Sequence, residues 1–167
     1  GALVKTIMTE NAMEFVSPHT FKSITKQSVS YKLFDENAPI EHISLADWAD
    51  IFIIAPATAN IIGKIANGIA DDLLSTSIMA GKAKKIIVPA MNVNMYENTI
   101  VQKNIAFIKS HGFLIMEPSI GYLACGYTGK GRFPDPSDIL DFVKISSLTD
   151  RELVNKKYSL LQGQVVK

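Results

Sequence analysis

The sequence contains one cysteine, three histidines, one tryptophan and almost no net charge, and these scarcities exclude several classes of protein. Cys125 cannot form a disulfide within the chain, which is typical of a reducing compartment, so we expect a cytoplasmic protein. The 17 basic residues nearly balance the 16 acidic ones, so nucleic acid is not expected as a partner. No apolar run approaches the roughly 20 residues of a membrane-spanning helix, so no membrane contact is expected.

The chain does have a large apolar fraction, because 47% of its 167 residues are hydrophobic and 20% are charged. This composition is sufficient for the core of one domain. Strand and helix signals alternate, which predicts a parallel sheet with helices on both faces, that is, a doubly wound α/β fold. We expect strands at residues 3–8, 51–55, 85–88 and 113–116, and helices at 10–15, from 18 onward, and at 41–48, 61–66, 71–79, 99–110 and 136–144. Residues 27–39 are expected to be irregular and 117–136 to form a long loop.

Two of the expected strands run directly into loops of small and amide residues. The strand at 51–55 leads into residues 56–60, and the strand at 85–88 leads into residues 89–96. Open α/β folds bind ligands at the carboxyl ends of their parallel strands. The two loops therefore predict one shared cleft.

The first of these loops offers a hydroxyl and an amide, from Thr58 and Asn60. Its small residues, Ala57 and Ala59, would let a flat ring approach the backbone, although an ordinary helix cap before Ile61 is the alternative.

In the second loop, the amides of Asn92 and Asn94 could bind a carboxylate or the edge of a flavin, or they could simply form a turn. The sequence leaves these two interpretations equally open. Met91 and Met95 are of a type that more often serves packing.

Three further positions have an ordinary interpretation beside a functional one. His42 could carry a proton near neutral pH, but a surface histidine paired with Glu41 or Asp47 is slightly favoured. The pair at residues 71–72 is interpreted as acidic residues at a helix N-terminus, and no metal is expected because no histidine lies at ligand spacing. Cys125 sits in a glycine-rich segment near two cations that could lower its pKa or hold an anionic substrate, so a functional role is favoured over a buried small hydrophobe.

Taken together, these residues resemble the homo-oligomeric flavin-containing cysteine decarboxylases. The matching blocks, in chain order, are residues 42–50, 55–60, 65–72, 89–92 with 95–96, and 124–126 through 131–132. The resemblance implies a Rossmann-like, three-layer α/β/α flavoprotein. It implies a flavin-binding decarboxylase domain at residues 1–144, apparently without the family's first strand and glycine-rich turn, and a linker at 145–167 toward a missing ligase domain.

The activity that the resemblance implies is FMN-dependent decarboxylation of 4'-phosphopantothenoylcysteine to 4'-phosphopantetheine in coenzyme A biosynthesis. The thiol is oxidised to a thioaldehyde, CO2 leaves, and the resulting enethiol is reduced again. His42 is implied as acid and base, Asn92 as the anchor of the substrate carboxylate, and Cys125 as the proton donor for the reduction. The implied FMN contacts are Thr9, Phe15, Pro56, Thr58, Ala59, Asn60 and Ala90. The implied substrate contacts are Asn92, Met95, Ala124, Lys130 and Arg132, with the segment 121–132 closing over the substrate.

The family also implies a homotrimer, or a dodecamer of trimers, with the site between subunits. Two alternatives stay open. A peptidyl-cysteine decarboxylase of lantibiotic maturation would share the histidine and asparagine blocks but lack the Ala-Cys-Gly segment. A non-catalytic regulatory relative would have lost one of the three key groups, all of which are present here.

Overall fold

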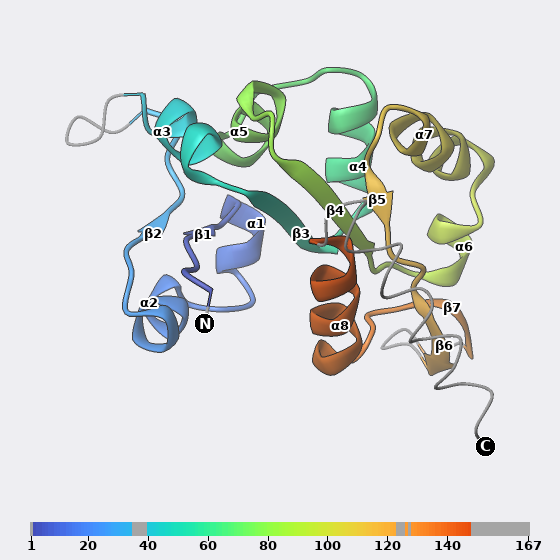
Figure 1. The fold of residues 1–167 in the computed structure, drawn as a ribbon. Helices are drawn as coiled ribbons and strands as arrows, with labels where there is room; N and C mark the ends of the chain where they lie inside the picture. The colour runs from blue at the N-terminus through green and yellow to red at the C-terminus, as the bar shows by residue number, and fades with distance from the viewer. Residues whose placement is uncertain (1, 35–39, 123–125, 127, 148–167) are drawn as a thin grey trace.

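The computed structural model describes residues 2–34, 40–122, 126 and 128–147 (Figure 1). In chain order the elements are β1 Thr6–Ile7, α1 Glu10–Met13, α2 Pro18–Thr25, β2 Val29–Ser30, α3 Glu41–Trp48, β3 Ile51–Ala57, α4 Ala59–Ala66, α5 Leu73–Ala80, β4 Lys84–Pro89, α6 Val93–Tyr96, α7 Thr99–Ser110, β5 Leu114–Ile115, β6 Ser119–Tyr122, β7 Thr128–Arg132 and α8 Pro136–Ser146. In the part of the chain that is described, no helix has the length and apolar character to span a bilayer.

The centre of the fold is a parallel sheet with the strand order β3-β4-β5. β4 is a run of apolar residues, as expected for a strand covered on both faces, whereas β3 has one open face on which Ile53 is 45% exposed. Ile86, Ile87 and Val88 of β4 are completely buried. The alternation of parallel strands and helices confirms the α/β fold class expected from the sequence.

A second parallel pair, β1 with β2, lies beside this sheet. β2 is a correction to the sequence analysis, which expected irregular structure at residues 27–39. The strand is only two residues long, and its hydrogen bonds come from β1, so a short polar segment gave no periodic signal. Ile7 of β1 packs against the buried cluster of the larger sheet, which joins the two layers.

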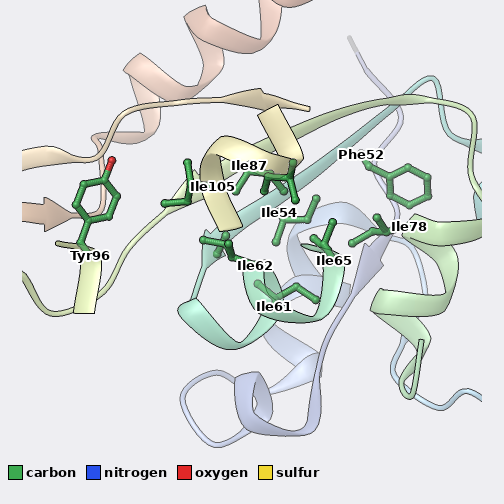
Figure 2. Packing of buried hydrophobic residues seen from close by; sticks show 11 residues of the cluster. Phe52, Ile54, Ile61, Ile62, Ile65, Ile78, Ile87, Tyr96 and Ile105 are labelled. Atoms are coloured by element: carbon green, nitrogen blue, oxygen red, sulfur yellow. The ribbon is translucent and has the colours of Figure 1, made fainter. Parts of the chain in front are cut away.

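The core lies between the central sheet and α4, α5 and α7. In Figure 2, Ile61, Ile62 and Ile65 of α4 point toward Ile54 and Ile87 of the sheet. These positions repeat at the three- and four-residue spacing that keeps side chains on one face of a helix. Because α4 starts directly at the end of β3, this packing fixes where the loop at residue 58 lies.

The segment 117–136, expected as a long loop, contains the antiparallel hairpin of β6 and β7. Glycine at positions 121, 129 and 131 hides the strand signal, because glycine has no side chain to alternate between faces. The short helix α6 was also missed, since four residues are too few to show a helical period. The expected helix at residues 99–110 is confirmed with the same bounds.

The acidic pair at residues 71–72 joins α4 to α5. The Lys64 ammonium lies 2.6 Å from Asp71 and 2.7 Å from Asp72, and Asp72 is the N-cap of α5 in a capping box with Ser75. Partial burial alone would raise the pKa of Asp72, but hydrogen bonds from Lys64 and Ser75 outweigh it and lower that pKa. The pair therefore serves helix capping, as the sequence predicted.

We predict that Asp72→Ala lowers the free energy of unfolding by about 1 kcal/mol near neutral pH, the usual effect of losing an N-cap. Because the folded pKa is lowered, this stabilisation is present above the unfolded pKa of about 4 and is lost as the pH falls through the folded value. Urea denaturation at several pH values measures it. Asp141→Ala, in the exposed ion pair with Lys144 on α8, is the control and should change little. A penalty for Asp72→Ala that is equal at acid and neutral pH would contradict the assignment.

Candidate functional site

The carboxyl ends of β3 and β4 are joined at the backbone. Beyond the last regular pair of residues the register shifts, and Ala57 lies opposite Pro89. The Ala90 amide then donates a hydrogen bond of 3.0 Å to the Ala57 carbonyl. The two loops that the sequence analysis placed in one cleft are therefore direct neighbours.

The surface around this junction is formed by small residues with polar groups beside them. Ala57 is buried, whereas Ala59 and Ala90 are half-buried and Thr58 and Asn60 are exposed. Thr58 occupies the N-cap position of α4, but its side chain makes no cap hydrogen bond. The expectation of a helix cap at Thr58 is therefore confirmed for its position, but the capping hydrogen bond from its side chain is not formed. We call these small residues, Ala57, Ala59 and Ala90, the floor of the candidate site. Their lack of large side chains, with the Thr58 hydroxyl and the Asn60 amide beside them, is compatible with a planar ring that has a polar edge, as FMN has.

The other expected FMN contacts lie around this floor or on α1. Pro56, preceded by a cis peptide bond, is exposed. Thr9 is the N-cap of α1, and its hydroxyl oxygen accepts a hydrogen bond of 3.2 Å from the Ala12 amide. Phe15 follows α1 and is 88% exposed, so its ring has almost no packing partner within one copy of the chain. Such an aromatic ring is available to a ligand or a second subunit.

Asn92 is the N-cap of α6, and its side-chain oxygen accepts a hydrogen bond of 2.8 Å from the Asn94 amide. The turn-forming role considered in the sequence analysis is therefore present. It uses the amide oxygen and fixes the direction of the side chain. Met95, in the same short helix, is 47% exposed.

The hairpin docks on this asparagine loop through positions that have no side chain. The Met91 amide donates a hydrogen bond of 3.0 Å to the Gly131 carbonyl. Gly131 has a φ of +144°, and a Cβ there would overlap the Met91 carbonyl oxygen. A Cβ at Gly129 would lie 2.7 Å from Val93 Cγ2. Two glycines in β7 thus permit a backbone approach that any larger residue would block.

A polar cluster lies at the base of the hairpin. The Tyr96 hydroxyl donates to Glu117 Oε2 at 3.1 Å, and the Lys130 ammonium lies 2.5 Å from the same oxygen. The hydrogen bond from Lys130 lowers the pKa of Glu117, while burial, and then the nearby carboxylate, raise the pKa of Tyr96. Sequence reasoning missed Tyr96 and Glu117, because no motif at their spacing reveals a contact that only the hairpin creates.

The two expected substrate cations on β7 differ in their partners. Lys130 is paired with Glu117, as described. Arg132 lies 3.6 Å from Asp135 and is half exposed, a distance that corresponds to a loose ion pair. Of the two, Arg132 therefore has the weaker ion pair within the chain and the charge that is more available to a substrate. Ala124 and Cys125 lie outside the described residues.

His42 lies on α3, far from the asparagine loop. Figure 1 shows α3 at one end of β3, with α6 and the hairpin toward the other. The expected surface pairing of His42 with Glu41 or Asp47 is not found among the ion pairs of the described residues. The Nδ1 atom of His42 is buried and has no hydrogen-bond partner. One copy of the chain therefore does not bring His42 and Asn92 together.

The fold and the strand-end floor define a flavin-binding α/β protein, and comparison with known proteins identifies the family. The family model described as Flavoprotein matches residues 1–147. The chain belongs to the Flavoprotein family.

Individual relatives agree with this membership. The chain is 48% identical over 168 aligned residues to the coenzyme A biosynthesis bifunctional protein CoaBC of Bacillus subtilis (strain 168), covering 99% of this chain and 40% of that protein. A PPC decarboxylase mutant in complex with pantothenoylaminoethenethiol is similar at 28% identity and a TM-score of 0.76, covering 86% of this chain and 82% of that one. The FMN binding protein AtHal3 is similar at 28% identity and a TM-score of 0.77, covering 87% and 83%. The chain thus spans less than half the length of the curated relative that it matches.

We predict that Gly131→Ala lowers the free energy of unfolding by about 1–3 kcal/mol, because alanine is strained at this φ and its methyl group would overlap Met91. Urea denaturation measures the change. The matched control is Gly63→Ala in α4, where the nearest atom to an added Cβ is 3.9 Å away. Within a helix this exchange should stabilise by about 0.5–1 kcal/mol. Equal effects of the two substitutions would show that the hairpin does not dock on the asparagine loop.

Proposed function

We propose that the protein is an FMN-dependent decarboxylase that converts 4'-phosphopantothenoylcysteine into 4'-phosphopantetheine. The observation that carries the proposal is the hydrogen bond from the Ala90 amide to the Ala57 carbonyl, which joins the small residues at the end of β3 to the asparagine loop after β4. Family membership and the similarity to CoaBC support the choice of cofactor and reaction. When bound, FMN supplies the two-electron oxidation and later re-reduction that the decarboxylation of an ordinary thiol requires.

The chain's own residues orient the substrate and move its protons. Thr58 and Asn60 would hydrogen-bond the polar edge of the cofactor above the small residues of the floor. The side chain of Asn92, directed by its bond to the Asn94 amide, would anchor the substrate carboxylate. Arg132 would contact the substrate's anionic end, and Lys130 would share its ammonium between that group and Glu117.

Proton transfer would fall to two groups that lie apart in the sequence. His42 would act as the acid and base, because an imidazole can take up and release a proton near neutral pH. Cys125, between the two hairpin strands in the sequence, would donate the proton in the reductive half. The hairpin would exclude water from the substrate.

We propose further that the site is completed between subunits of a homotrimer, or of a dodecamer of trimers. The separation of α3, which carries His42, from α6 and the hairpin supports this (Figure 1). The exposed Phe15 fits the same arrangement. We also propose a cytoplasmic location, and residues 145–167 as a linker toward a ligase domain.

Thr58→Val should weaken FMN binding about three- to tenfold, which corresponds to the loss of one hydrogen bond. Visible absorbance and flavin fluorescence titration measure the affinity. Ser110→Ala is the control, because that hydroxyl bonds only within the end of α7 and should leave the affinity unchanged. A wild-type protein that shows no flavin absorbance after reconstitution with FMN would contradict the proposed cofactor.

We predict that two variants separate the two halves of the reaction. His42→Asn should release no CO2 from 4'-phosphopantothenoylcysteine, because the acid and base is lost. Cys125→Ser should release one CO2 per bound FMN and then stop without air, because the enethiol is not reduced and the flavin keeps the two electrons. In air, oxygen reoxidises the flavin and the enethiol accumulates, which a thiol assay and mass spectrometry distinguish from the saturated product. Normal 4'-phosphopantetheine formation by either variant would remove that residue from the mechanism. Enethiol as the final product of the wild-type protein would favour the peptidyl-cysteine decarboxylase alternative.

A further inference from the structure

The base of the hairpin holds a set of charged and polar groups of which the proposed reaction uses Lys130 alone. Tyr96 comes from α6, Glu117 from the connection between β5 and β6, and Lys130 from β7. These segments are distant in sequence, yet their polar atoms converge on one carboxylate oxygen, Glu117 Oε2.

The geometry around that oxygen is more specific than that of an ordinary surface ion pair. Tyr96 is only 5% exposed, so its hydroxyl is costly to leave without an acceptor, and the described acceptor is Glu117. The Lys130 ammonium also lies 5.6 Å from the centre of the Tyr96 ring, within the range of a cation–π contact. Each of the three groups thus contacts the other two.

The position of Tyr96 explains what such a cluster could control. Figure 2 shows Tyr96 at the edge of the apolar cluster, away from Phe52 and Ile78. Its backbone is held as well, because the Tyr96 amide donates to the Asn92 carbonyl at 2.9 Å and the Gln102 side-chain amide donates to the Tyr96 carbonyl. The Tyr96 ring is therefore held in a fixed position on α6, the short helix that Asn92 caps.

We propose that Tyr96, Glu117 and Lys130 are positioning residues that fix the hairpin relative to Asn92. Glu117 holds Lys130 of β7 against Tyr96 of α6, so the distance between the hairpin and the asparagine loop is set by side chains as well as by the glycine contacts. The three residues act through Asn92 and Arg132, which would contact the substrate. The part of this proposal that concerns catalysis rests on the proposed function.

The experiment measures amide hydrogen exchange in the FMN-loaded protein by mass spectrometry. In Glu117→Gln and in Lys130→Met, exchange at residues 119–122 and 128–132 should accelerate about fivefold, while exchange in β4 stays unchanged. Lys130→Arg keeps the charge pair and should restore slow exchange. Asp141→Asn, which breaks the exposed pair on α8, is the matched control and should leave the hairpin unaffected.

A second measurement separates positioning from stability alone. In Glu117→Gln, KM for 4'-phosphopantothenoylcysteine should rise about fivefold while FMN affinity stays within twofold of wild type, and Asp141→Asn should leave both values unchanged. Unchanged hairpin exchange in Glu117→Gln and Lys130→Met, or an unchanged KM beside faster exchange, would overturn the proposal. A wild-type protein that binds FMN but releases no CO2 would contradict the proposed function instead, since the exchange experiment needs no turnover.

Discussion

The pairing of β3 with β4, extended by the hydrogen bond from the Ala90 amide to the Ala57 carbonyl, is the interaction on which the candidate site depends. It brings together two loops that are a helix pair apart in the chain. Both strands are held from below by α4, whose buried isoleucines pack on Ile54 and Ile87. The apolar core therefore determines where the floor lies. The polar residues of the loops lie beside the floor and do not position it. This division is typical of α/β proteins, in which a rigid sheet positions variable loops at its carboxyl edge.

The second element of the site, the hairpin, is attached in a different way. It contributes little to the apolar core and meets the asparagine loop at two glycines, Gly131 against the Met91 backbone and Gly129 against the Val93 side chain. Backbone contact of this kind requires the absence of side chains, so it gives specificity of position with little buried apolar area. The hydrogen bond from the Met91 amide to the Gly131 carbonyl also joins the hairpin to the asparagine loop. The polar contacts among Tyr96, Glu117 and Lys130 further restrict how the hairpin is oriented. The sheet and the hairpin therefore differ in what holds them, since apolar packing holds the sheet, whereas polar contacts and close approaches at glycine hold the hairpin.

The sequence was sufficient for the parts of the molecule that burial determines. The continuous apolar runs predicted β3 and β4, and the helical period at residues 99–110 predicted α7 with its observed bounds. The sequence was insufficient where a partner determines the structure. β2 forms because β1 is beside it, and the strands of the hairpin contain glycines that carry no alternation. Glu117 has no signal of its own, since its role depends on Tyr96 and Lys130 meeting there. The Gly-Lys-Gly spacing at residues 129–131 was the one available sign that a backbone approaches closely.

His42 and Phe15 bear on the proposal that the site lies between subunits. The Nδ1 atom of His42 is enclosed without a hydrogen bond, and leaving a buried polar atom unpaired costs about 1–3 kcal/mol. Because the chain itself encloses this atom, a second copy of the chain cannot reach it without a local rearrangement. Phe15, almost fully exposed, presents the opposite case of an apolar ring that the chain leaves uncovered. A second copy can cover an exposed ring without any rearrangement, and burial of its apolar surface is favourable. Of the two features, it is therefore Phe15 that supports the proposed site between subunits.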